Sequence, residues 1–475
     1  MNGTLLKIVD LTSHSEEEIS GLFRGGFKAA SPGVLRTVRD IIEDVRRRGD
    51  EALCEYTRSY DHVDLTPSEF RLSPEEVWSC IGQPAGATTV KTAGKTAGSM
   101  KDIHGASDDE HLTRTGTLTP AGTPDPALET AIETAIRRVR EFHEREVYED
   151  WSYRDEYGNL LGRKWTPIER VGVYVPGGKA CYPSTLIMTV VPALVAGVKE
   201  ISVVSPPSSF TPPSSLALAI QKIGGVSSVY RVGGVQALAA LAFGTDTVKR
   251  VDKIVGPGNI YVTAAKKELY GFVDIDMLAG PSEVLVIADG SVDPKLTAVD
   301  LLAQAEHDEE ARAMCITTSE AHARAIVEQV AILTESSKRR SIIESSLKHN
   351  GRIYVVKDEK DAVALANAIA PEHLELHMEN PQGMLLEIRN AGAIFLGALS
   401  PEALGDYVAG PSHVLPTGGS ARFSSPLSVL SFMKFSSIID ISNRGFGELG
   451  GHASVMAEAE GLSSHAGSVQ LRREE

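Results

Sequence analysis

Four short stretches of this sequence place histidine next to carboxylate or amide side chains, a combination suited to metal binding and proton transfer. In Gln304-Ala-Glu-His307 the two polar ends are three residues apart, so on a helix they share a face. An amide oxygen and an imidazole nitrogen at that spacing can hold one metal ion. The alternative is a helix that simply ends in a polar turn. The other stretches are Glu372-His373, Asp406 with His413, and Glu460 with His465.

Glu372 and His373 are adjacent, so they cannot share a face of either a helix or a strand. At the mouth of a strand they would supply two proton carriers that point in different directions. Histidine titrates near neutral pH, which suits a general base. The alternative reading is a histidine at a helix end beside an exposed glutamate.

The stretch from Gly405 to Gly419 has four glycines, two prolines and almost no apolar periodicity, which predicts a loop of defined shape. Within it, Asp406 could be a hard oxygen ligand and His413 a substrate contact. Glu460 and His465 flank a glycine turn close to the end of the sequence. A histidine there is usually solvated, so the residues alone do not give it a function.

Bulk composition narrows the class of protein. With 475 residues the chain is expected to form more than one domain, and 63 acidic against 47 basic residues argue against a nucleic-acid partner. No apolar run reaches membrane length, so we expect no membrane partner. The four scattered cysteines predict a reducing compartment without disulfides or thiolate metal sites. We expect a cytoplasmic enzyme, with an organelle left open.

Strands alternate with helices twice along the chain, which predicts an α/β fold with two doubly wound parallel sheets. The first run has Gly-rich turns after its strands, as in Val171–Val175 and Lys253–Val255. The second run extends from about Glu283 to Leu396, and helical periodicity fills the region before residue 82. Ligands are expected at the carboxyl ends of the strands, including a nucleotide, although no Gly-x-Gly-x-x-Gly fingerprint is present.

Residues 82–125 are rich in Gly, Thr, Ala and Ser, which predicts a flexible surface insertion. Gly94-Lys95-Thr96 is similar to the end of a phosphate-binding loop. Thr89 stands where that motif needs glycine, so we reject a phosphate site there.

From about Trp151 to Arg472 the sequence resembles histidinol dehydrogenase. The similarity lies in long motifs in the same order, of which the clearest are Arg170–Gly178, Gly233–Ala240, Val255–Asn259, Ala279–Leu285, Gln304–His307, Pro371–Leu374, Asp406–Thr417 and Glu458–Gly461 with His465. The resemblance implies sheets related to incomplete Rossmann folds. It also implies that the chain is divided into four parts. These are an N-terminal arm over residues 1–25, a first α/β domain over 26–172 and 284–427, a second, NAD-binding α/β domain over 173–283, and a small C-terminal tail domain over 428–475.

The resemblance also assigns roles to individual residues. It implies one Zn²⁺ per chain, held by Gln304, His307, Asp406 and His465. Substrate would contact Ser282, Gln304, His307, His373, Asp406, His413, Glu460 and His465. NAD⁺ would contact Tyr174, Gln236 and Asn259. His373 would be the base that takes the alcohol proton, and Glu372 would activate water for a second oxidation.

The implied reaction is the oxidation of L-histidinol to L-histidine, through the aldehyde and with two NAD⁺, in the final steps of histidine biosynthesis. The resemblance further implies a homodimer in which the tail of one chain completes the active site of the other. Two alternatives stay open. One is a related zinc and NAD dehydrogenase of another small amino alcohol or diol, and the other is a catalytically silent paralogue that only binds.

Overall fold

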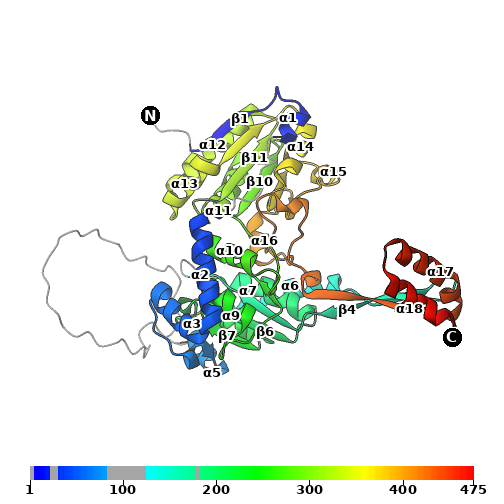
Figure 1. The fold of residues 1–475 in the computed structure, drawn as a ribbon. Coiled ribbons are helices and arrows are strands. Elements are labelled where there is room, and N and C mark those ends of the chain that lie inside the picture. Colours follow the sequence, from blue (N-terminus) through cyan, green and yellow to red (C-terminus); the bar gives the residue numbers. More distant parts are fainter. Residues whose placement is uncertain (1–4, 22–29, 83–124, 178–180, 475) are drawn as a thin grey trace.

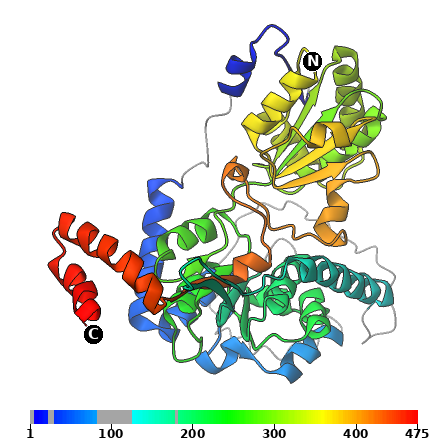
Figure 2. The same cartoon turned by 90° about the vertical axis from the view of Figure 1, so that its right-hand side faces the viewer.

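The computed structural model describes residues 5–21, 30–82, 125–177 and 181–474 of the chain. The predicted insertion at 82–125 lies almost wholly outside these residues, as does Gly178. In the described parts, the strands form two six-stranded sheets and one three-stranded ribbon. The two sheets lie in separate bodies, and the ribbon forms an arm that extends away from them (Figures 1 and 2).

The first sheet is parallel throughout, in the order β1-β12-β11-β10-β13-β14. Its strands are β1 (Lys7–Asp10), β10 (Glu283–Ala288), β11 (Arg312–Thr317), β12 (Arg352–Val355), β13 (His373–His377) and β14 (Ala393–Leu396). Its helices are α1 (Glu16–Gly21), α11 (Pro294–Ala305), α12 (Glu320–Glu335), α13 (Arg340–Asn350), α14 (Glu359–Ile369), α15 (Pro381–Leu385) and α16 (Glu402–Tyr407).

Both faces of this sheet are buried. In the central strand β10, Val284 and Val286 pack into the core beneath α11, α12 and α13, while Leu285 and Ile287 pack into the core beneath α1 and α14. Side chains alternate along a strand, so an unbroken apolar run fits a strand covered on both sides. The prediction of a doubly wound α/β sheet is confirmed here.

The second sheet has the order β2-β7-β6-β5-β8-β9, with only the edge strand β2 antiparallel. Its strands are β2 (Arg71–Leu72), β5 (Arg170–Tyr174), β6 (Glu200–Ser205), β7 (Ser228–Arg231), β8 (Lys253–Val255) and β9 (Asp274–Ile275). Its helices are α2 (Pro32–Arg48), α3 (Asp50–Tyr56), α4 (Pro67–Phe70), α5 (Pro74–Gly82), α6 (Pro126–His143), α7 (Pro183–Val195), α8 (Ser215–Ile223), α9 (Gly234–Phe243) and α10 (Ile260–Leu269). Shorter helical turns are η1 (Thr57–Asp61), η2 (Glu144–Glu146), η3 (Pro207–Phe210), η4 (Ser420–Arg422) and η5 (Val429–Phe432).

The division of the N-terminal half differs from the expected one. We assigned 26–172 to the first domain, but α2 and α3 share one core with α9 and α10, and α5 and α6 share another with α7 and α8. These helices therefore cover the second sheet. Within residues 1–25, which were predicted as an N-terminal arm, β1 pairs in register with β12 at the edge of the first sheet. Apolar periodicity identifies a helix face but not the sheet that the face covers.

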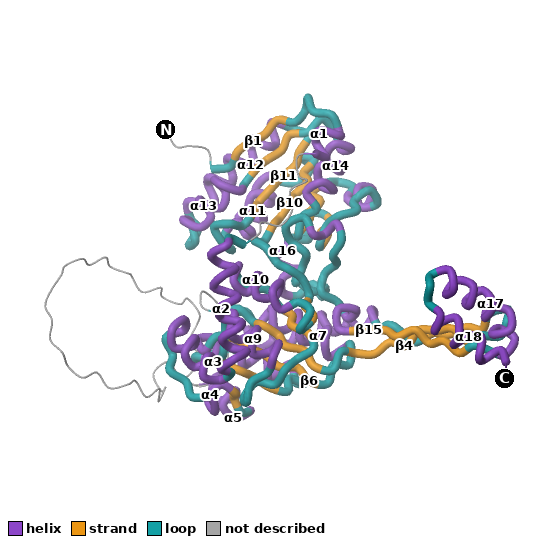
Figure 3. The backbone as a smooth tube through the Cα atoms, viewed as in Figure 1, coloured by secondary structure: helices purple, strands orange, loops and turns teal. Residues whose placement is uncertain are grey.

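The C-terminal tail is carried on a ribbon that the sequence did not predict. β15 (Met433–Asp440) pairs antiparallel with β4 (Leu160–Pro167), which pairs with β3 (Trp151–Arg154). Beyond the ribbon, α17 (Asn443–Ala459) and α18 (Ser463–Glu474) pack on each other at the end of the arm (Figures 1 and 3).

The structure also describes the cysteines and the length and polarity of the helices. All four cysteines are free, so none of them forms a disulfide. Across the parts of the chain that the structure describes, the helices are too short or too polar to cross a membrane.

Candidate active site

The last turn of α11 positions the first two predicted ligands. Gln304 is fully buried near the end of the helix, and His307 lies just beyond the end, where its N–H donates to the Gln304 carbonyl (3.2 Å). His307 itself is exposed. The helix ends two residues before His307, yet the spacing still brings both side chains to the same place.

The amide group of Gln304 is fixed by a carboxylate. With its nitrogen facing Glu402, the amide donates to both carboxylate oxygens, at 2.9 and 3.1 Å. This assignment of the amide rests on the hydrogen bonds it makes. Because the NH₂ group is used in this way, the amide oxygen is free to act as a ligand.

Helix α16 brings two acidic side chains to the same face. Glu402 and Asp406 are four residues apart, and each offers an oxygen that lies within 4.8 Å of a ring nitrogen of His307 and of the other. Burial raises the pKa of Glu402 well above its usual range. Glu402 was not a predicted site residue, because the residues from Gly405 were predicted as a loop, whereas α16 extends to Tyr407 and carries Asp406 one turn after Glu402.

The loop after α16 holds His413 beside Asp406. His413 Nδ1 donates to the Asp406 carbonyl (2.9 Å) and lies 3.7 Å from its Oδ1. The same loop is tied to the second body, because Arg138 of α6 donates to the carbonyls of Val408 and Ala409. The loop therefore lies between the two α/β bodies and carries His413 there, next to Asp406 at the end of α16.

Glu372 and His373 are held by the first residue of the neighbouring strand. The Glu283 N–H donates to Glu372 Oε2 (2.8 Å), and His373 Nδ1 donates to the Glu283 carbonyl (3.0 Å). The proton on Nδ1 leaves His373 Nε2 as an acceptor, 3.9 Å from Asp406 Oδ1. Both residues are buried. Burial raises the pKa of Glu372 well above its usual range and lowers the pKa of His373.

These residues correct our expectation of a site at the carboxyl ends of the strands. His373 is the first residue of β13, and Ser282 immediately precedes β10. The site thus lies at the amino edge of the first sheet. His373 and His413 both line a cavity of ≈ 530 Å³, together with apolar residues that include Phe142 and Phe395.

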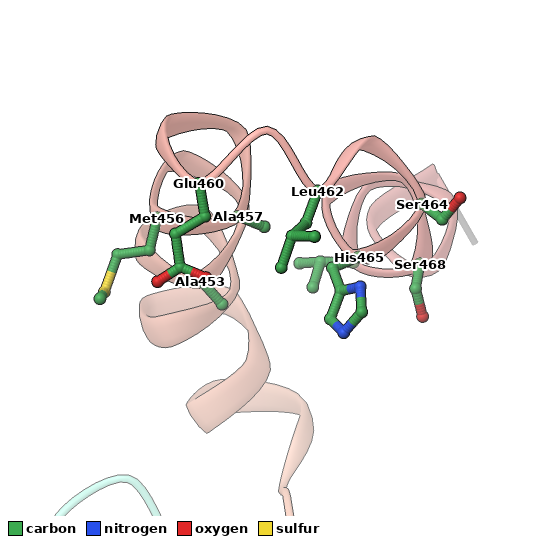
Figure 4. Close-up of a pocket in the computed structure, with 9 residues that line it drawn as sticks. Ala453, Met456, Ala457, Glu460, Leu462, Ser464, His465 and Ser468 are labelled. Atoms are coloured by element: carbon green, nitrogen blue, oxygen red, sulfur yellow. The ribbon is translucent and has the colours of Figure 1, made fainter.

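Glu460 and His465 are not brought to this place within one chain. They line a separate hollow of ≈ 600 Å³ between α17 and α18. Both side chains are exposed, and they point to the same side of the helix pair (Figure 4). That helix pair lies at the far end of the arm, away from the α/β bodies (Figure 1).

The three predicted cofactor residues meet at the carboxyl edge of the second sheet. Tyr174 ends β5 and its hydroxyl accepts from the Gly234 N–H (3.4 Å). Gln236 is buried in the first turn of α9, and Asn259 caps α10 by accepting from the N–H groups of the next turn. This edge is where parallel sheets bind nucleotides.

The turn between β8 and α10 is built around a glycine and a buried ion pair. Gly256 has φ +114°, and a Cβ there would lie 2.1 Å from the Tyr174 carbonyl oxygen. Lys266 and Asp276 form an ion pair with 2% and 1% of their side chains exposed. Lys266 donates to the Gly256 carbonyl and Asp276 accepts from its N–H. The pair thus fixes the peptide next to Tyr174.

Several known proteins are similar to this chain over nearly its whole length. A family model described as histidinol dehydrogenase matches residues 28–97 and 88–473, so the similarity reaches well before Trp151. The histidinol dehydrogenase of Neisseria gonorrhoeae is 45% identical over 460 residues, which is 95% of this chain and 97% of the relative. That of Aquifex aeolicus is 45% identical over 438 residues, 92% of each chain. The crystal structure of histidinol dehydrogenase from Elizabethkingia anophelis superposes with a TM-score of 0.84 at 32% identity, covering 100% of this chain and 99% of that one. This chain belongs to the histidinol dehydrogenase family.

Proposed function

We propose that this NAD-dependent dehydrogenase oxidises L-histidinol to L-histidine with one Zn²⁺ in its active site and two NAD⁺ per turnover, in the final steps of histidine biosynthesis. Family membership supports the substrate and the pathway. The proposal is carried by one observation. Ligand atoms of His307, Asp406 and Glu402 lie within 4.8 Å of one another, Glu402 accepts from the Gln304 amide, and the buried His373 and Glu372 lie beside them.

The donor set fits zinc. An imidazole, a carboxylate oxygen and an amide oxygen are borderline-to-hard ligands that Zn²⁺ accepts, and they leave positions for a further ligand and for substrate. The Glu402 carboxylate fixes the orientation of the Gln304 amide by accepting from its NH₂ group. Metal ligands in proteins are commonly held by such a second hydrogen-bond partner. When bound, Zn²⁺ would anchor the nitrogen atoms of histidinol and orient its alcohol, and NAD⁺ would accept hydride.

The chain's own residues handle the protons. His373 carries its proton on Nδ1, so its Nε2 can take the proton of the alcohol while the carbon is oxidised to the aldehyde. Burial lowers the pKa of His373, which keeps the ring neutral and ready as a base. Glu372 then takes a proton from the water that attacks the aldehyde, so that a second oxidation gives the carboxylate.

Substrate binding would use residues on several elements. Ser282 and His413 would contact histidinol from the first body and the loop, and Glu460 from the tail. The cavity beside His373 and His413 has room for a small amino alcohol. Tyr174, Gln236 and Asn259 would hold NAD⁺ at the edge of the second sheet.

The tail is best explained by a homodimer. His465 would be the remaining zinc ligand, yet it belongs to α18, which in one chain lies at the end of the arm, away from α16 with Asp406 (Figure 1). The arm is also too apolar for a free surface, with Phe435, Ile439 and Met456 between 49% and 68% exposed. A second copy of the chain would cover this surface and receive the tail in its active site.

Formation of NADH from L-histidinol, with and without a chelator, tests the proposal. We expect two NADH per histidinol, little free aldehyde, and loss of activity when zinc is removed. Replacing His307 by alanine should weaken zinc binding and abolish most activity. A panel of amino alcohols and diols tests the rival substrates. Absence of turnover with every alcohol would instead favour a silent binding protein, and activity unaffected by metal removal would contradict the zinc site.

A further inference from the structure

The turn at the tip of the arm ribbon holds a buried asparagine. Asn159 closes the turn between β3 and β4, and only 1% of it is exposed. Its side-chain NH₂ donates to Asp155 Oδ2 (2.9 Å), and its backbone N–H donates to Asp155 Oδ1 (2.9 Å). The Asp155 carboxylate therefore fixes the direction in which the Asn159 amide oxygen points.

That oxygen holds the start of the tail. It accepts from the N–H of Ser442 (3.0 Å), the residue that caps α17. The Ser442 hydroxyl donates to the Tyr157 carbonyl of the same turn (2.7 Å) and accepts from the Gly445 N–H in the first turn of α17 (3.0 Å). The turn at the ribbon tip and the first turn of α17 are thus joined in one hydrogen-bonded unit.

Helix α17 also passes very close to the asparagine. Gly445 is buried, and a Cβ at this position would overlap the Asn159 amide. Gly447, two residues further along the same helix, has open space around the position of its Cβ. The contact with Asn159 therefore restricts the angle between the ribbon and the helix.

A small change in this angle is enlarged at the far end of α17. The helix has 17 residues, so Glu460, its C-cap, lies about 27 Å from Ser442. A tilt of about 10° at the start of the helix would displace its end by about 5 Å. The start of α17 is therefore the point at which the place of Glu460 is decided.

The two tail helices are tied to each other. Gln470 of α18 bridges them, because its amide donates to the Ser454 hydroxyl (3.0 Å) and to Glu458 Oε1 (2.8 Å) on α17. Glu460 and His465 lie on one side of this pair (Figure 4). Both residues therefore move with the start of α17.

We propose that Asn159 is a positioning residue of the active site: it sets the angle at which α17 leaves the ribbon and so places Glu460 and His465 in the site of a partner chain. The inference rests on the proposed function, because it takes the tail of one chain to complete the site of another. Metal–ligand distances vary by only about 0.2 Å, so a displacement of several ångströms would remove a ligand.

Two variants break the contact from opposite sides. Asn159→Ala removes the acceptor of the Ser442 N–H, and Gly445→Ala pushes the helix off the same side chain. We expect each to lower kcat/KM for histidinol by about 10²-fold, the cost of a small misplacement at an active site. Competition with a chromophoric chelator should show weaker zinc binding, while KM for NAD⁺ stays unchanged. Gly447→Ala is the matched control, because it favours the helix as much as Gly445→Ala does but meets nothing, and it should keep full activity.

Mixed dimers show whether the lesion belongs to the tail. Asn159 lies 283 residues before Ser442, yet Asn159→Ala should behave as a tail variant. Co-refolded with His373→Ala, it should give activity in roughly a quarter of all sites, because one site of each mixed dimer then has an intact body and an intact tail. Co-refolded with His465→Ala, it should recover nothing, because every tail then carries a lesion.

The pair His373→Ala with His465→Ala is refolded in parallel as the reference. If the reference recovers activity but Asn159→Ala does not recover it with His373→Ala, the inference is overturned and the shared site stands. Recovery of Asn159→Ala with His465→Ala, or normal kcat/KM in both Asn159→Ala and Gly445→Ala, has the same meaning. If the reference stays inactive after confirmed subunit exchange, tail exchange itself is refuted, and the role of Asn159 in the partner's site is refuted with it.

Discussion

At the scale of single residues, Glu372 and His373 are neighbours at the start of β13, and their pKa values shift in opposite directions. Burial raises the pKa of Glu372 and lowers that of His373, while the backbone of Glu283 holds both of them. The histidine is therefore kept neutral with Nε2 open. The glutamate needs nearby positive charge to ionise, which a bound Zn²⁺ would supply. This division of roles leads to a prediction for each oxidation step.

Replacing Glu372 by glutamine should block the second oxidation more than the first. The amide keeps the size of the side chain but cannot take a proton from water, a loss of about 10²–10⁴ in rate for that step. We expect the yield to fall from two NADH per histidinol towards one, with aldehyde trapped by hydroxylamine. His373→Asn is the control and should slow the first step. If Glu372→Gln still forms two NADH per histidinol, Glu372 does not activate the water for the second oxidation.

Glu402 is predicted to control zinc affinity through Gln304. In Glu402→Gln the carboxylate that accepts from the Gln304 amide is lost, so that amide can turn its NH₂ towards the metal. Outer partners of this kind are worth about 10–100-fold in metal affinity. Competition with a chromophoric chelator should show weaker zinc binding, with kcat at saturating zinc less affected. Glu309→Gln, an exposed change nearby, should leave the affinity unchanged, and equal affinities in the two variants would contradict the role.

The sequence predicted several side chains that the structure brings together, and it missed others for physical reasons. Gln304 and His307 were found because helical spacing is visible in the sequence. Glu402 was missed because its importance comes from its contact with Gln304, nearly 100 residues away in the sequence. Such contacts depend on the fold and leave no local pattern.

At the scale of elements, the two bodies present opposite edges of their sheets. The first contributes the amino ends of β10 and β13, and the second the carboxyl ends of β5 and β8. The sequence predicted most of these strands and that they run parallel, but this does not tell which edge of a sheet meets the neighbouring body. The helix α13 and the strands of the arm were also missed. The arm strands bury little surface within one chain, so they lack the alternating pattern of a covered strand.

The turn between β8 and α10 should depend on its buried ion pair. Asp276→Asn leaves Lys266 charged and buried without a counter-charge, which costs about 3–5 kcal/mol of stability. Because the pair fixes the Gly256 peptide beside Tyr174, we also expect a higher KM for NAD⁺. Urea unfolding and steady-state kinetics measure the two effects. Glu200→Gln, which breaks the exposed ion pair with Lys249, should cost about 1 kcal/mol or less. A similar small loss in Asp276→Asn would contradict the argument.

At the scale of the whole molecule, the chain is two doubly wound bodies and an arm. Periodicity predicted the two sheets, and the resemblance predicted the tail. Neither could show that α2 covers the second sheet or that β15 pairs with β4, because such pairings join segments more than 100 residues apart. The position of the arm leads to a prediction about assembly.

Two inactive variants should restore each other if tails are exchanged. His373→Ala is dead through its body and His465→Ala through its tail. In a mixed dimer one site receives both lesions and the other receives none. Random assortment makes about half the dimers mixed, so roughly a quarter of all sites should be active after co-refolding. NADH formation measures the recovery. No recovery after confirmed subunit exchange would show that each tail serves its own chain.

The length of the ribbon sets how far the tail helices lie from the two α/β bodies. β4 and β15 pair over eight residues, from Met433 opposite Pro167 to Asp440 opposite Leu160, and α17, the first of the two tail helices, begins just beyond that end. Because a strand advances about 3.4 Å per residue, inserting two residues in each strand would carry His465 about 7 Å further out. A single residue inserted in one strand would move the following side chains of that strand to the opposite face of the ribbon. The number of paired residues in the ribbon therefore determines at what distance from the α/β bodies Glu460 and His465 lie.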